Sequence, residues 1–63
     1  MAKTNAQMLN DINSLLALYV TTGNRQVLTQ VRQAVTKLLR KTPTMVHVVE
    51  EAFNDNQLSM KIL

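Results

Sequence analysis

The chain has 63 residues, a net charge of +3 and no cysteine. The lack of cysteine excludes disulfides, zinc–thiolate sites and cysteine nucleophiles, and 46% hydrophobic with 17% charged residues is a globular composition. So short a chain hides only about 60% of the surface that its unfolded form exposes. We therefore expect a single domain over residues 1–63 that gains stability by self-association.

Two further exclusions concern membranes and secretion. No apolar run approaches the ~20 residues that cross a bilayer. The N-terminal segment is amphipathic, without the unbroken apolar core and cleavage site of a secretory signal. We expect a cytoplasmic protein.

The first predicted helix covers residues 4–21. Thr4 and Gln7 have the spacing of a capping box, and Gly23 suits the left-handed conformation that ends a helix. At about 100° per residue, one face is apolar and comprises Met8, Leu9, Ile12, Leu15, Leu16, Tyr19 and Val20. Leu18 lies off that face, so it is either an exposed leucine or a contact for another chain.

The second predicted helix covers residues 24–41, with Asn24 as its N-cap. It has the clearest amphipathic pattern in the chain. The apolar side comprises Val27, Leu28, Val31, Ala34, Val35, Leu38 and Leu39. All charges on the polar side are positive, and they come from Arg25, Arg32, Lys37, Arg40 and Lys41. The last three lie near the helix end, where cations complement the helix dipole.

The third predicted helix covers residues 43–54, with Thr42 as its cap and Pro43 in its first position. Its apolar side comprises Met45, Val46, Val49, Ala52 and Phe53. Residues 55–63 form an apolar tail whose pattern fits either a strand or a last helical turn. Because an exposed apolar tail is unusual, we expect this segment to close the bundle or to reach a second protomer.

These elements predict an all-α fold: a small, self-associating helical bundle of three amphipathic helices with a short C-terminal turn or arm. No arrangement typical of an enzyme accompanies it. His47 and Glu51, four residues apart, predict an exposed ion pair, while Ser14 and Ser59 are distant and lack flanking glycines. A zinc site from His47, Glu50 and Glu51 has poor geometry, because its ligands point in different directions around one turn. We expect no catalysis, no cofactor and no metal.

The charged surfaces are the remaining candidates. Arg25, Arg32 and Arg40 lie near one line, with Lys37 and Lys41 to the side, and such rows contact phosphates. The alternatives are a solvated face, a nucleic acid, an acidic protein and an anionic membrane surface. Glu50, Glu51 and Asp55 form an acidic patch that is either solvated or in contact with a basic partner, including the basic helix of another copy.

Two observations argue against a nucleic acid as the partner of this helix. The turn at residues 41–44 lacks the usual glycine of a helix-turn-helix. The two aromatic residues, Tyr19 and Phe53, lie on apolar faces and are not placed for base stacking. In favour of it, Gln26, Gln30 and Gln33 on the basic helix are residues that recognise base edges.

Residues 3–16, with Asn10, Asp11 and Ile12 followed by Leu15 and Leu16, resemble the first helix of the bacteriocin immunity proteins of lactic acid bacteria. Residues 24–28 resemble the start of that family's second helix, and Leu58 with Ser59 resembles a Leu-Ser that opens a late helix. The resemblance covers mainly residues 3–40. The family forms a longer, four-helix antiparallel bundle, whereas this chain has room for three helices and a stub.

The resemblance implies a cytosolic protein that protects its producer from its own pore-forming peptide at a membrane sugar-transporter receptor, without an enzymatic step. The basic helix would then face the negatively charged inner leaflet, which makes the protein peripheral at the inner membrane face. We therefore expect a non-enzymatic interaction protein, most concretely of this immunity type. Two alternatives are a small basic nucleic-acid-binding regulator of phage or plasmid type and a phage-type inhibitor of a host protein. The expected protein contacts are Leu18, Leu58, Ile62 and Leu63.

Overall fold

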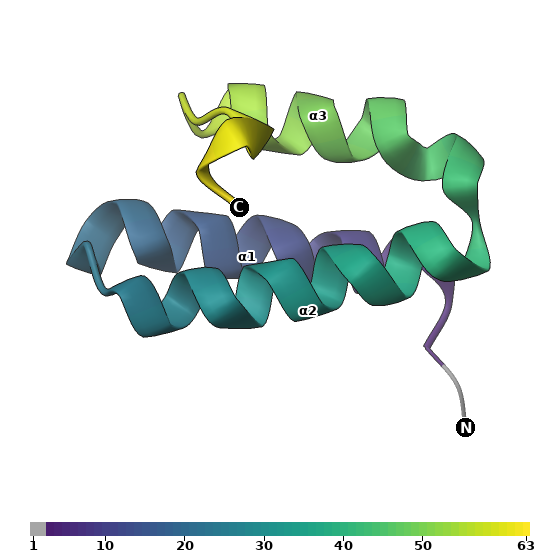
Figure 1. Ribbon diagram of the computed structural model, residues 1–63, viewed down its shortest axis with the longest axis horizontal. Helices are drawn as coiled ribbons and strands as arrows, with labels where there is room; N and C mark the ends of the chain where they lie inside the picture. Colours follow the sequence, from purple (N-terminus) through teal and green to yellow (C-terminus); the bar gives the residue numbers. More distant parts are fainter. Residues whose placement is uncertain (1–2) are drawn as a thin grey trace.

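The computed structural model describes residues 3–63 and contains three α-helices, α1 (Asn5–Thr22), α2 (Arg25–Lys41) and α3 (Val46–Asp55). Two 3₁₀ turns, η1 (Pro43–Met45) and η2 (Met60–Ile62), follow α2 and end the chain. α1 and α2 form an antiparallel hairpin, and α3 runs back along it, antiparallel to α2 (Figure 1). The described residues contain no strand, so the predicted all-α fold of three helices is confirmed.

The hairpin is delimited by local hydrogen bonds that the side chains themselves supply. Gln7 N–H donates to Thr4 Oγ1 at 3.1 Å and Thr4 N–H donates to Gln7 Oε1 at 2.9 Å, which is the expected capping box. Gly23 ends α1 in the left-handed conformation, with φ 67°. Asn24 Oδ1 then accepts from Gln26 N–H at 2.9 Å and starts α2. The turn between the two helices therefore has only two residues, so the helices lie side by side.

The prediction that Thr42 caps the third helix is wrong. Thr42 makes no side-chain cap bond, and its hydroxyl accepts instead from Asn5 Nδ2 at 3.1 Å. Pro43 consequently begins η1, and α3 starts only at Val46. The Asn5–Thr42 bond ties the start of α1 to the end of α2, a contact across 37 residues that no local pattern reveals.

The core lies where the three helices meet. Its buried side chains are Ile12, Leu16, Val27, Val31, Val35, Leu38, Val49, Ala52 and Phe53. All of them lie on the faces predicted to be apolar. Val20 does not follow this pattern, because its side chain is 55% exposed. The C-terminal end of α1 extends past the end of α3, so the last turn of α1 lacks a covering helix (Figure 1).

The end of α3 and the tail form one compact unit. Leu58 N–H donates to Phe53 O at 2.8 Å and Gln57 N–H donates to Asn54 O at 2.9 Å, the pair of bonds that defines a Schellman motif. Gln57 occupies the left-handed position of this motif, with φ 59°. The chain then turns back, and Leu58, Met60 and Leu63 pack against the core of their own chain. The tail thus adopts a 3₁₀ turn, and not the alternative strand.

A helix needs about 20 predominantly apolar residues to cross a bilayer. Within residues 3–63, none combines the length and the apolar character that a membrane span requires.

Candidate functional site

The outer surface of α2 carries five exposed cations, Arg25, Arg32, Lys37, Arg40 and Lys41. We call this set the α2 basic face. With a rise of about 1.5 Å per residue, Arg25, Arg32 and Arg40 follow each other along the helix at intervals of about 11 and 12 Å. Lys37 and Lys41 lie on the flank of α2 nearer to α1, by their positions on the helical wheel. The structure places all five cations on one helix with exposed side chains.

None of these cations forms an ion pair within residues 3–63. Among residues 3–63 the one ion pair joins Lys3 to Asp11, and neither belongs to α2. No acidic residue occurs between Asp11 and Glu50. The Lys41 ammonium donates to the backbone oxygen of Lys3 at 3.2 Å, which holds the N-terminal segment against the end of α2 without cancelling charge. The α2 basic face is consequently an uncompensated positive surface.

The acidic side chains are on a different helix. Glu50, Glu51 and Asp55 are exposed on α3, together with His47. The predicted ion pair between His47 and Glu51 does not form in the structure of residues 3–63. The molecule is therefore electrostatically polarised, with positive charge along α2 and negative charge along α3. In the described part of the chain, no three His, Asp or Glu side chains converge in a way that could hold a metal ion.

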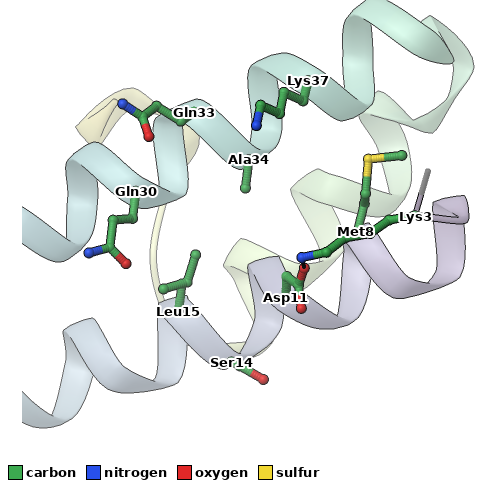
Figure 2. A pocket seen from close by; sticks show the side chains of 9 residues that line it. All are labelled: Lys3, Met8, Asp11, Ser14, Leu15, Gln30, Gln33, Ala34 and Lys37. Carbon is green, nitrogen blue, oxygen red and sulfur yellow. Dashed lines mark hydrogen bonds and ion pairs between the residues drawn. The ribbon is translucent and has the colours of Figure 1, made fainter. Parts of the chain in front are cut away.

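A groove with a volume of about 650 Å³ runs between α1 and α2 (Figure 2). Met8, Leu15 and Ala34 give it an apolar floor. Its lining comes from the hairpin and the segment before it, without any residue of α3 or the tail: Lys3, Met8, Asp11, Ser14, Leu15, Gln30, Gln33, Ala34 and Lys37. Asp11 and Lys37 stand on opposite walls, and Lys3 reaches Asp11 from the N-terminal side (Figure 2).

The four residues that we expected to contact a protein partner differ in exposure in the structure. Leu18 is 46% exposed and lies on the groove side of α1, three residues after Leu15 and four after Ser14. Ile62 is 37% exposed, whereas Leu58 and Leu63 are half-buried against the core. Leu18 therefore lies on the same side of α1 as Ser14 and Leu15 of the groove lining.

Sequence reasoning missed the groove. Met8, Leu15 and Ala34 were assigned to the apolar faces of their helices, and the helical pattern shows which residues share a face. It does not show that α3 covers only one side of the hairpin.

Comparison with known proteins supplies no relative. No protein-family model, curated protein or solved structure matches the chain. The candidate surfaces are therefore interpreted from their own geometry and charge.

Proposed function

We propose that this protein acts by binding and not by catalysis, and that it engages a polyanionic partner through the α2 basic face. The observation that carries the proposal is the set of five exposed cations on one helix without a paired carboxylate. Such a surface attracts polyanions and accelerates their association. The segregation of Glu50, Glu51 and Asp55 onto α3 supports it, because the resulting charge asymmetry turns α2 toward a negative partner.

Duplex nucleic acid is the partner class that this surface fits best. The helix has 17 residues, a length of about 25 Å, and its arginines recur along most of that length. Arginine and lysine contacts to phosphates supply sequence-independent affinity for a duplex. Single strands need exposed aromatic rings for base stacking. Here Phe53 is fully buried and Tyr19 is packed against the core, which favours a duplex over a single strand.

Charge reversal tests this proposal. The double variant Arg32→Glu with Arg40→Glu should lower the affinity for a labelled duplex of about 20 base pairs by about 100-fold or more at low salt, because two phosphate contacts become repulsive. Fluorescence anisotropy measures the affinity. The single variant Arg32→Glu should also lower the affinity, and its matched control is Lys61→Glu, which changes the net charge equally but lies in η2, outside α2 and the groove. Equal binding by Arg32→Glu and Lys61→Glu would contradict a role for α2.

A second candidate is an immunity-type role at a membrane receptor complex. Residues 3–40, which carry the resemblance, form the α1–α2 hairpin, and this hairpin displays both the exposed Leu18 and the α2 basic face. The cationic face would then meet the anionic inner leaflet, while Leu18 contacts the receptor. Both candidate roles place the protein in the cytoplasm, and this one places it at the inner membrane face.

Expression in a bacteriocin-sensitive strain separates the two roles. The immunity-type role predicts protection against at least one pore-forming peptide of a panel, and Leu18→Asp should remove the protection. Unchanged sensitivity to the whole panel would leave the polyanion proposal standing and contradict the immunity-type role.

A further inference from the structure

We propose that the groove between α1 and α2 is the interface of a two-fold dimer, in which a second copy of this chain packs hairpin to hairpin. The groove lies beside the arginine row of the α2 basic face, which is outside its lining, and Lys37 is the one cation of that face that the groove shares. Two properties of the groove support the proposal: its uncovered apolar floor and the arrangement of its charges.

The floor consists of apolar side chains that the single chain covers only in part. Met8, Leu15 and Ala34 are half-buried, and Leu18 continues their surface along α1 with 46% of its area exposed. Removal of apolar surface from water contributes about 25 cal/mol per Å². A domain of this size holds a small stability margin, so burial of this surface against a second copy offers a substantial gain.

The charges of the groove are self-complementary. Asp11 stands on the α1 wall and Lys37 on the α2 wall (Figure 2). A two-fold axis parallel to the hairpin, between the two copies, places α1 of each copy over α2 of the other. Each Asp11 then faces Lys37 of the other copy, and the same contact forms twice, as an isologous interface requires. A two-fold axis perpendicular to the helices would instead stack α1 on α1 and α2 on α2, without the pairing of Asp11 with Lys37.

The existing partner of Asp11 does not prevent this pairing. The Lys3–Asp11 pair is solvent-accessible, with the side chains 63% and 43% exposed. Exposed pairs of this kind contribute little, so Asp11 is available to a second cation. Two small residues of the groove lining, Ser14 and Ala34, allow the helices of the two copies to approach closely. In the resulting dimer, α1 and α2 of both copies form a four-helix bundle with antiparallel neighbours, and α3 of each copy lies on the outside.

Sedimentation velocity in the absence of nucleic acid tests the proposal. The full-length protein should change from one chain to two as its concentration is raised about a hundredfold, and no larger species should form. Asp11→Lys and Lys37→Asp should each lower the association constant by about tenfold or more, because each places like charges opposite one another. The combined variant restores the pairing with the charges exchanged, and its association should return to within about threefold of the unmodified protein.

Two controls match the singles in net charge. Glu50→Lys on α3 matches Asp11→Lys, and Arg32→Asp outside the groove matches Lys37→Asp; both should leave the dimer intact. Circular dichroism verifies that each variant is helical. A single-chain mass at every concentration would overturn the proposal. So would singles that behave like their controls, or a combined variant that stays as weak as the singles.

Discussion

At the scale of single residues, Gln57 has a backbone conformation that is unfavourable for its residue type. Its φ of 59° lies in the left-handed region, which is costly for a residue with a Cβ atom. It occupies the position of the Schellman motif where glycine is usual. The equivalent position at the end of α1 is held by Gly23, so the chain meets the same requirement with glycine once and with glutamine once.

Replacement of Gln57 by glycine should therefore stabilise the protein. We expect the free energy of unfolding to rise by about 0.5–1 kcal/mol, since the relief of left-handed strain exceeds the added entropy of the unfolded chain. Urea denaturation followed by circular dichroism measures the change. Thr36→Gly in the exposed middle of α2 is the control and should lower the stability by about 0.3 kcal/mol. A loss of stability in Gln57→Gly would contradict the assigned backbone conformation.

The roles of residues that form hydrogen bonds with near neighbours in the sequence were predictable. Thr4 and Asn24 cap helices through bonds that span two or three residues. Thr42 and Val20 were not predictable. The hydroxyl of Thr42 is bound by Asn5, which is distant in sequence, and the exposure of Val20 depends on where α3 ends. Propensity and periodicity describe a helix by itself, and these two positions depend on a second helix.

At the scale of elements, the tail stabilises the bundle more than its length suggests. Leu58, Met60 and Leu63 pack on the core beside the fully buried Phe53. Because these residues are only partly buried, we assign each about half of the 1.5–3 kcal/mol that a fully buried side chain contributes. The tail should thus supply about 2–4.5 kcal/mol, which is a large share because the core of so small a domain rarely supplies more than about 3–5 kcal/mol.

Truncation after Gln57 tests the contribution of the tail. The shortened chain should lose about 2–4.5 kcal/mol of its free energy of unfolding and should therefore unfold at a much lower urea concentration than the complete chain. Ile62→Ser removes an apolar side chain that is 37% exposed and should change the stability by less than about 1 kcal/mol. A truncated chain that unfolds with the stability of the complete chain would show that the core does not need the tail.

The amphipathic pattern predicted the faces of the helices but not their arrangement. Every apolar residue assigned to α2 is buried or half-buried, as the pattern requires. The groove arises because α3 packs on one side of the hairpin and leaves the other side uncovered. Which helices pack together depends on the length of the turns and on contacts such as the Asn5–Thr42 hydrogen bond. Such contacts belong to the tertiary structure and do not follow from the spacing of apolar residues.

At the scale of the whole molecule, the central feature is the separation of charge between α2 and α3. The sequence predicted the positive face of α2 because that helix contains no acidic residue. It left open whether other parts of the chain neutralise this face. The structure shows the cations of α2 exposed and without carboxylate partners in the described chain, and it places the acidic side chains on a separate helix.

The most direct test of the central claim is the salt dependence of duplex binding by the unmodified protein. A duplex of about 20 base pairs is titrated at several salt concentrations, and log K is plotted against log salt. Contacts by three to five cations of the α2 basic face predict a slope between about −2.7 and −4.5. A slope shallower than about −1, or no binding at low salt, would contradict the proposal that α2 engages a polyanion.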